Sequence, residues 1–473
     1  MMRRGLVMLL VSTLLLLALP SCRRKSPPTS PTGPFGEVKP PPKSAEAAKQ
    51  DWERGRQRAE EAQREEAQKP RVITVEGLTE ILRIENVSAA LCGDLEGNGS
   101  FRIIGTFWSQ QGRDIQREMV MYDVKGSVHA RWPVKHPGYQ MCLVQADDDR
   151  EKEIVIVYHG PGHRQSELTV YEVNGSSLWN HEEAADLYLS ATPDLNGHDK
   201  TEYVIVTREG GEARGLKLLD ADGAIRWERN DLGSICPIET GDLDGDGTQE
   251  IVVEHQHVLG VSEISILDAR GVTIRSFSGG DIAGLDGLQG VADIVPESPG
   301  PEILVSTTSR VGSFASGFSY QRSLAALTAD GKILRSWPVD DLYELIWVTD
   351  LVPTSSGPEM LVSTFSPSAG KFGVAVLSGD GTRLFDVPLA RRNASHREGI
   401  YYQTVGEFLV VVRPIVHPQL LILDSRGQVV GNIEGFDGLE LVGADDSSGI
   451  PTIIVIVLQD RTRSLVAYTL EKE

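Results

Sequence analysis

A short run of alternating aspartates carries the clearest chemistry in the sequence. The stretch GDLDGDGTQEIVV places carboxylates at the first, third, fifth and ninth positions of one loop: Asp242, Asp244, Asp246 and Glu250. Oxygen ligands in this number suit a hard cation such as Ca²⁺ better than a transition metal. An EF-hand loop also needs a bidentate glutamate at position twelve, where this chain has Val253. An apolar, strand-like run follows the acids, so we interpret the stretch as a cation loop in a β protein.

Seven further copies of this pattern lie along the chain. Six of them keep a short polar loop before an apolar run: GDLEGNGSFRIIG from Gly93, ADDDREKEIVIV from Ala146, PDLNGHDKTEYVIV from Pro193, ADIVPESPGPEILV from Ala292, TDLVPTSSGPEMLV from Thr349 and ADDSSGIPTIIVIV from Ala444. The seventh, GEFLVVV from Gly406, keeps the apolar run without the acids. Internal repetition of this kind is the main sequence signal of a repeat architecture.

A second element lies downstream of each copy and consists of two alternating apolar runs joined by a turn. Seven glycines end these turns: Gly126, Gly175, Gly223, Gly271, Gly331, Gly381 and Gly427. Several of the turns contain Asn-Gly or Asp-Gly, which favour tight hairpins. Consecutive turn glycines are 46 to 60 residues apart, and a period of this size with about four short strands is typical of a propeller blade.

The ends of the repeat region predict how the ring closes. There are eight loop copies but only seven complete hairpins, because the last repeat ends at LVAYTLEKE. A spare strand, VITVEGLTEILRI, lies upstream of the first repeat. If this strand completes the last blade, the ring closes without an open sheet edge at the junction. We therefore predict an all-β fold, a single β-propeller of eight blades over residues 71–473, with seven blades as the alternative.

The loops and the strands that follow them resemble the FG-GAP and VCBS repeat propellers, which include the blades of integrin α subunits. The resemblance covers nearly all of residues 90–473. It implies that the four carboxylates of the opening stretch, with a backbone carbonyl near Thr248, hold structural Ca²⁺. It implies no single function, since the family includes adhesins, lectin-like modules, lyases and scaffolds.

The other loops keep only part of this ligand set. The first offers Asp94, Glu96 and Asn98, with Arg102 at the ninth position, and the third offers Asp194, Asn196 and Glu202, with His198 at the fifth. The second is interpreted as shortened, with its register open; its acids are Asp147, Asp148, Asp149, Glu151 and Glu153. The fifth and sixth loops replace the acids with VPESPGPE and VPTSSGPE, which shape a turn without an ion. This mixture predicts a structural role for calcium; the alternative is an acidic loop that only caps a turn.

The N-terminus predicts export and a lipid anchor. A basic start is followed by a short apolar segment and then by Leu-Pro-Ser-Cys, which resembles a bacterial lipobox with Cys22 as the lipidated residue. An ordinary secretory signal is the alternative. Residues 23–43 form a proline-rich linker and residues 44–70 a charged helical or disordered spacer. Arg23 after the cysteine favours the outer membrane, with the propeller in the periplasm or facing the surface.

Composition limits the partners. The formal net charge of −21 argues against nucleic acid. Beyond the lipobox the chain has three cysteines, Cys92, Cys142 and Cys236. We expect free buried thiols, although a bridge between the first two stays open.

The loops opposite the acidic ones are the candidate ligand face. They join the second strand of each blade to the third, or one blade to the next, and combine aromatic, histidine and arginine residues: Trp108, His159, His163, His255, His257, Arg310, Phe314, Phe318, Tyr320, Arg391, Arg392 and Arg413. Arginine beside aromatic rings suits an acidic glycan or an acidic protein segment. The alternative is that polar loop residues gather there without cooperating. The long segment 307–323 is predicted to be a loop of this face.

The function predicted from the sequence is non-enzymatic. We expect a monomeric, lipid-anchored propeller that binds an envelope protein or an acidic polysaccharide. A calcium-dependent polysaccharide lyase and an outer-membrane assembly scaffold are the alternatives. The chain has no nucleophile elbow, Walker loop or HExxH motif.

Overall fold

The structure is a computed structural model that describes residues 73–470. Short internal segments lie outside the description: 112–113, 137, 139, 161–164, 196, 198–199, 210–211, 257–261, 299, 314–316, 339–341, 352–356, 367–370, 389–400, 407, 414–417 and 446–450. Every regular element in the described part is a β-strand. None of the described residues forms a helix long and apolar enough to cross a bilayer.

Blades 1 to 4 follow one another along the chain. Blade 1 contains β3 (Val87–Asp94), β4 (Phe101–Gln111), β5 (Asp114–Tyr122) and β6 (Val128–Pro133). Blade 2 contains β7 (Gln140–Val144), β8 (Glu153–His159), β9 (Ser166–Tyr171) and β10 (Ser177–Glu183). Blade 3 contains β11 (Asp186–Ala191), β12 (Tyr203–Glu209), β13 (Glu212–Leu219) and β14 (Ile225–Arg229). Blade 4 contains β15 (Ser234–Gly241), β16 (Glu250–Gln256), β17 (Ser262–Leu267) and β18 (Thr273–Ser278).

Blades 5 to 8 complete the ring. Blade 5 contains β19 (Leu285–Ala292), β20 (Glu302–Ser313), β21 (Gly317–Leu327) and β22 (Ile333–Pro338). Blade 6 contains β23 (Leu342–Thr349), β24 (Glu359–Ser366), β25 (Lys371–Leu377) and β26 (Arg383–Pro388). Blade 7 contains β27 (Tyr401–Val405), β28 (Phe408–Arg413), β29 (Gln419–Leu423) and β30 (Val429–Glu434), with β1 (Thr74–Glu76) added. Blade 8 contains β31 (Gly438–Asp445), β32 (Thr452–Gln459) and β33 (Thr462–Leu470), with β2 (Leu78–Glu85) as its fourth strand.

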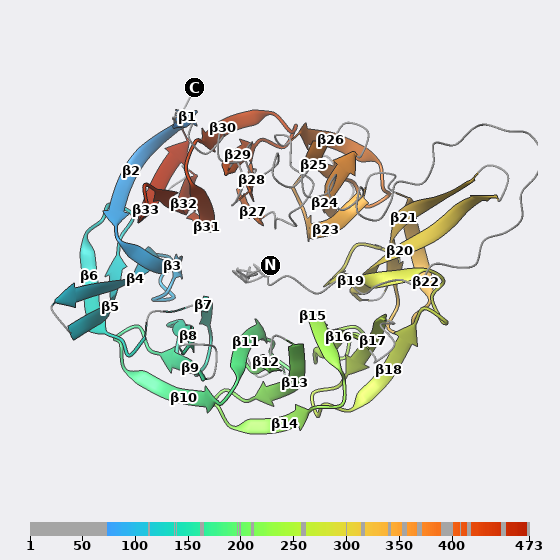
Figure 1. Cartoon of the computed structure of the whole chain (residues 1–473), viewed down its shortest axis with the longest axis horizontal. Helices are drawn as coiled ribbons and strands as arrows, with labels where there is room; N and C mark the ends of the chain where they lie inside the picture. Colours follow the sequence, from blue (N-terminus) through green and yellow to red (C-terminus); the bar gives the residue numbers. More distant parts are fainter. Residues whose placement is uncertain are drawn as a thin grey trace, which may run out of the picture. The chain divides into compact units, whose positions relative to one another are not determined.

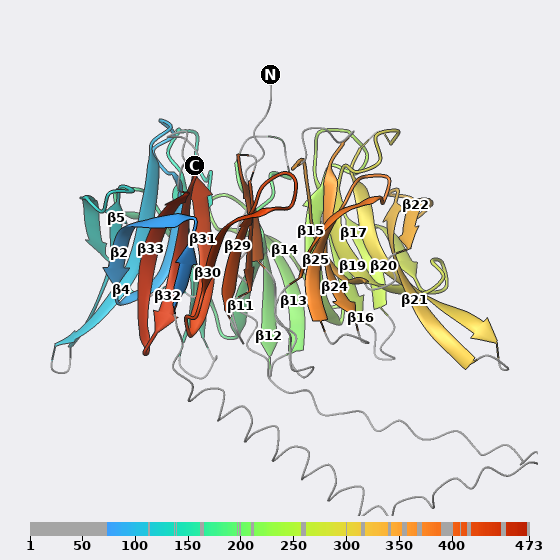
Figure 2. The same ribbon diagram turned by 90° about the horizontal axis from the view of Figure 1, so that it is seen from above.

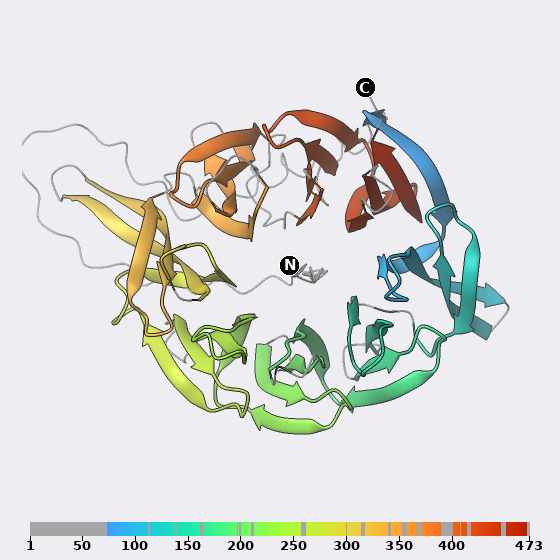
Figure 3. The same ribbon diagram turned by 180° about the vertical axis from the view of Figure 1, so that it is seen from behind.

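The eight sheets are antiparallel and stand in a ring (Figure 1). The first strand of each blade lies nearest the centre and the fourth lies on the perimeter, as the view from behind also shows (Figure 3). The predicted eight-bladed propeller is confirmed. Because neighbouring strands run in opposite directions, the loop after the first strand and the turn after the third emerge on one face. The remaining loops emerge on the other face.

The predicted closure of the ring is also confirmed. Strand β2 pairs with β33 from Leu78 opposite Leu470 to Glu85 opposite Ser464. The upstream segment makes two strands, where the sequence predicts one. Gly77, with φ of +66°, turns the chain beside Val430, and β1 on its other side extends blade 7 by pairing with β30. The N-terminal segment therefore holds two blades together at the junction.

The core lies between blades rather than within one sheet. In β16, Ile251 and Val253 pack against blade 3, whereas Val252 packs against blade 5. All three side chains are fully buried. A strand that is covered on both sides reads as a continuous apolar run, and this explains the IVV, IVIV and EILV runs that follow the loops.

Candidate cation loops and the opposite loop face

The loop of blade 4 joins β15 to β16 and is built around Asp242. Its carboxylate accepts the backbone N–H groups of Gly245 at 2.8 Å and Gly247 at 3.0 Å. Both glycines have positive φ, +77° and +89°, which lets the chain coil tightly around the carboxylate. Asp244 accepts the N–H of Asp246 at 3.1 Å. Local hydrogen bonds between these carboxylates and backbone N–H groups thus fix the shape of the loop without a bound ion.

This loop gathers three carboxylates. Oxygens of Asp242, Asp244 and Glu250 lie within 4.8 Å of one another. Burial raises the pKa of Glu250, and the neighbouring aspartates raise it further. Such a cluster can hold a divalent cation with hard oxygen ligands. Asp246, the remaining predicted carboxylate ligand, accepts the N–H of Thr248 at 2.7 Å and is not one of this group of three.

The buried glutamate of this loop recurs in four other blades. Each copy accepts the N–H of a residue seven or eight positions earlier, as Glu250 accepts that of Leu243 at 2.9 Å. The other copies are Glu153, Glu202, Glu302 and Glu359. In blades 5 and 6 only the first aspartate of the loop is kept, as Asp293 and Asp350, yet this glutamate remains fully buried. The glutamate therefore caps the turn in every case, and a cation is an addition to the turn where aspartates accompany it.

The loop of blade 2 has the same length as that of blade 4, so its interpretation as shortened is wrong. Glu153 accepts the N–H of Ala146 seven residues earlier, the same spacing as in blade 4. This register places Asp147 and Asp149 at the third and fifth positions and Gln145 at the first. Oxygens of Asp147, Asp149 and Glu153 lie within 4.8 Å of one another, as a second candidate cation cluster. The missing acid at the first position hid this register from the sequence.

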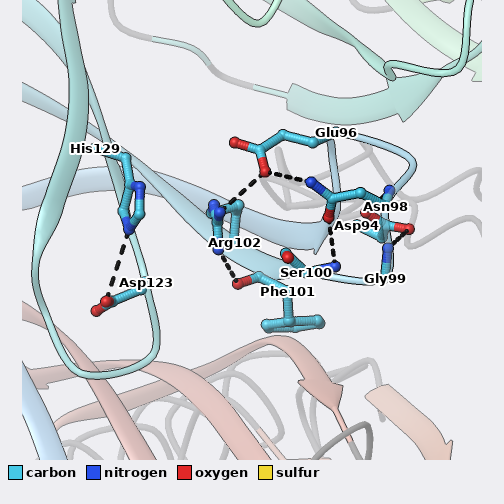
Figure 4. Close-up of polar contacts among 9 residues, drawn as sticks. All are labelled: Asp94, Glu96, Asn98, Gly99, Ser100, Phe101, Arg102, Asp123 and His129. Atoms are coloured by element: carbon cyan, nitrogen blue, oxygen red, sulfur yellow. Dashed lines mark hydrogen bonds and ion pairs between the residues drawn. The ribbon is translucent and has the colours of Figure 1, made fainter.

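In blade 1 an arginine takes the place of the buried glutamate (Figure 4). Arg102 lies 2.9 Å from the carboxylate of Glu96, which also accepts the amide of Asn98 at 2.9 Å. Asp94 accepts the N–H groups of Asn98 and Gly99 at 3.1 and 2.9 Å, the arrangement that Asp242 shows in blade 4. The loop therefore keeps its shape with a guanidinium where blade 4 has a carboxylate.

Blade 3 also carries an arginine at its loop. Arg226 lies 3.3 Å from Glu202, while Asp194 stands at the start of the loop. Asn196 and His198 lie outside the described residues. Among the described loops, the carboxylate clusters of blades 2 and 4 are therefore the candidates for a cation.

Neighbouring loops touch one another on this face. Lys152 of blade 2 donates its N–H to Leu95 of blade 1 at 2.6 Å, and Thr201 of blade 3 donates its N–H to Gln145 of blade 2 at 2.8 Å. Gly197 of blade 3 lies against the carbonyl of Gly247 in blade 4. The loops of blades 1 to 4 thus form a continuous arc, and a cation in one loop would stiffen its neighbours.

The opposite face places the predicted ligand residues in different surroundings. Trp108 on β4 is 55% exposed. His159 is nearly buried, and its Nδ1 lies 3.2 Å from both Asp186 and Ser166. His255 is 2% exposed and contacts the hydroxyl of Ser265 at 2.9 Å, so it belongs to the core of blade 4 and not to a ligand surface. The other predicted positions lie wholly or by their side chains outside the description: His163, His257, Arg310, Phe314, Phe318, Tyr320, Arg391, Arg392 and Arg413.

Ser166, His159 and Asp186 combine the residue types of a hydrolase triad without its geometry. A triad needs the serine and the aspartate on different ring nitrogens of the histidine. Here both contact Nδ1, and Ser166 is fully buried. The cluster is a structural link between blades 2 and 3.

Two long hairpins project on this face. Pairing runs to Gln111 opposite Asp114 in blade 1 and to Ser313 opposite Gly317 in blade 5. Figure 2 shows both hairpins extending beyond the same side of the ring, and Figure 1 places them across the ring from each other. The prediction of a loop over 307–323 is therefore wrong, because most of that segment is paired strand. Hydrogen bonds between the paired strands hold each hairpin extended, which an unpaired loop could not achieve.

Two cysteines are described with their side chains. Cys92 and Cys142 are free thiols, as expected. Burial raises the pKa of both, to about 12 for Cys142.

Comparison with known proteins finds distant structural similarities and no family. No family model matches the sequence, and no curated protein matches it. The Dos1 propeller shares 11% identity, with 84% of this chain and 97% of that chain covered and a TM-score of 0.48. The V. cholerae biofilm matrix protein Bap1 shares 14% identity over 81% of this chain and 77% of its own (TM-score 0.34), and the Neurospora crassa Pan2 WD40 domain 10% over 84% and 96% (TM-score 0.37). The protein is a β-propeller with distant structural similarity to these; the FG-GAP and VCBS resemblance stays a prediction.

Proposed function

We propose that the protein is a non-enzymatic, lipid-anchored propeller of the cell envelope that binds an acidic polysaccharide. Its blade 4 loop, and with it the blade 2 loop, takes structural Ca²⁺. The observation that carries this proposal is the separation of the two chemistries. The carboxylate clusters lie on one face, and the exposed Trp108 and the projecting hairpins lie on the other.

The calcium assignment rests on the donor set and on the comparison between blades. Asp242, Asp244 and Glu250 offer only oxygen, which calcium prefers. Blades 5 and 6 keep the glutamate-capped turn without acids at the third and fifth positions, so the ion clamps a turn that other blades make unaided. A clamp of this kind needs no chemistry at the bound ion. This organisation is what an FG-GAP or VCBS kinship would imply.

The anchor and the location rest on the N-terminal sequence. Lipidation of Cys22 would tether the ring through the proline-rich linker and the charged spacer, within reach of envelope polysaccharides. The first described strand, β1, is hydrogen-bonded to blade 7, so the tether joins the ring at its perimeter.

The separation of the faces also weighs against a calcium-dependent lyase. Such an enzyme needs a base beside a uronate held by its calcium ion. The clusters of blades 2 and 4 are on the face opposite Trp108, and the one Ser-His-Asp grouping among the described residues lacks catalytic geometry. We therefore place the glycan on the hairpin face and the ions on the other.

A binding assay with product detection tests the proposal. The full chain would be titrated with polyuronate, sulfated polysaccharide and neutral dextran, with Ca²⁺ or with EGTA, while new unsaturated ends are monitored at the ultraviolet absorbance of the 4,5-double bond. We expect saturable binding of an acidic polysaccharide without new ends. Turnover would establish the lyase instead. If none of the polysaccharides binds, the proposal is overturned in favour of a protein partner.

A further inference from the structure

Arg208 stands out among the charged residues of the hairpin face. It lies near the end of β12, and its guanidinium carbon is 4.6 Å from the centre of the Tyr188 ring on the neighbouring strand β11. The Nε atom of Arg208 is buried and has no hydrogen-bond partner among the described residues. A buried N–H without an acceptor costs free energy. The Nη atoms of Arg208 are not among the buried unpartnered atoms, so they are the donors that a ligand can contact.

Three other basic residues are paired within the protein. Lys135 lies 2.5 Å from Glu167, and Lys217 lies 2.5 Å from Glu183. Arg322 on blade 5 lies 3.5 Å from Asp286. Arg208 makes no ion pair with any described carboxylate. Its guanidinium is therefore held in one place by an aromatic ring while its donors lack an anion.

The carboxylate directly across the ladder from Arg208 already has a partner. Asp186 lies opposite Arg208 across the β11–β12 ladder, but its oxygen contacts Nδ1 of His159 at 3.2 Å. The His159 ring lies 5.0 Å from that of Tyr188. Tyr188 thus has a histidine and an arginine beside it, and the histidine engages the acid that would otherwise compete for the arginine.

We propose that Arg208, positioned on Tyr188, binds the carboxylate of a uronate residue; the inference rests on the proposed function and names its recognition residue. A planar guanidinium matches a carboxylate with two parallel hydrogen bonds. An extended peptide commonly binds by adding a strand to an open sheet edge. Strand β12 is paired on both sides, with β11 and β13, so it offers no such edge. This favours a sugar acid over an acidic peptide.

Substitutions in the full chain test the assignment, with oligogalacturonate as the probe and poly-L-glutamate in parallel. Arg208→Met should weaken oligogalacturonate binding at least tenfold. Arg208→Lys should be intermediate, because lysine keeps the charge and loses the planar donor fork. Arg322→Met is the matched control, since it removes an arginine of the same face that is already paired; we expect less than a twofold change.

Each outcome separates the inference from the broader proposal. Wild-type affinity in a folded Arg208→Met protein would overturn the role of Arg208 and leave polysaccharide binding intact. Binding of poly-L-glutamate but not oligogalacturonate would overturn the sugar assignment in favour of an acidic protein. Wild-type protein that binds neither probe would overturn the inference, and binding of the sulfated polysaccharide would then decide whether the proposed function holds. Equal losses in the Arg208→Met and Arg322→Met proteins would show a general charge effect and would also overturn the inference.

Discussion

The guanidinium of Arg102 lies 2.9 Å from the carboxylate of Glu96 and stands where blade 4 has the buried Glu250. The remaining parts of the two loops match, since Asp94 accepts backbone N–H groups as Asp242 does. The residue at this one position therefore decides the charge of the loop. An arginine there supplies a guanidinium to the carboxylates, whereas a glutamate adds a carboxylate to a cluster that needs a metal cation.

We predict that Arg102→Glu adds a calcium site to blade 1. Without calcium the variant should lose about 1–3 kcal/mol of unfolding free energy, because Glu96 loses its charged partner. With calcium most of this loss should be recovered. Isothermal titration should show one more bound ion than in the wild type. Arg102→Met removes the same cation without supplying a ligand, so a gain of ion binding in that control would contradict the reasoning.

Removing one ligand from blade 4 tests the site that the sequence predicted best. Asp244→Asn keeps the size of the side chain and removes one charge from the cluster. Calcium at about a hundred times its dissociation constant stabilises a protein by about 2.7 kcal/mol. We expect the shift in thermal midpoint between calcium and EGTA to fall by most of this increment, and the blade 2 loop to supply the shift that remains. Asp148→Asn is the control, because Asp148 is 85% exposed and outside the cluster; a similar loss there would mean that overall charge is responsible.

Much of the fold could be predicted because residues close together in the sequence determine its turns and strands. The turn glycines set the period, and the eight loop copies against seven hairpins located the closure in β2. The strand β1 was missed because a single glycine within an apolar run does not by itself indicate a turn. The φ of +66° at Gly77 shows that the chain turns there, between two strands.

The site was predictable only where residues close in sequence make it. Asp242 and Asp244 lie on one loop and were found. The blade 2 cluster was misread because Gln145 hides the register, which is fixed by a hydrogen bond from Ala146 to Glu153. The pairing of Arg208 with Tyr188 was missed because it forms across two strands, and no sequence spacing reports it.

The blade 2 loop should make stability without calcium depend on pH. Burial, aided by Asp147 and Asp149, raises the pKa of Glu153 from 4.5 to about 6. A raised pKa means that the folded state favours the protonated carboxyl. The contribution is therefore fully present below about pH 4.5 and is lost as the pH rises through 6, with a size on the order of 2 kcal/mol. Urea unfolding of the calcium-free protein at pH 5 and pH 7 measures the larger part of it. Glu153→Gln should remove this part of the pH dependence, and an unchanged difference would assign it to other groups.

Contact between an outer aromatic ring and the next hairpin should be a main source of ring stability. The indole of Trp179 in blade 2 packs on Gly223 of blade 3 and donates its N–H to the carbonyl of Ala221 at 2.7 Å. Gly223 has φ of +83°, and a Cβ built on it would lie 2.5 Å from Cε3 of the indole. Gly223→Ala therefore combines a backbone cost with a collision.

A second glycine separates these two costs. Gly99 has the same φ of +83° but no atom within 4 Å of the corresponding Cβ position. Gly99→Ala should cost about 1–2 kcal/mol from the left-handed backbone alone, and Gly223→Ala about 1–3 kcal/mol more from overpacking. Urea midpoints of the two variants in EGTA give the difference. Equal destabilisation would mean that the indole moves aside without cost, and the blade-to-blade contact would then contribute little to closing the ring.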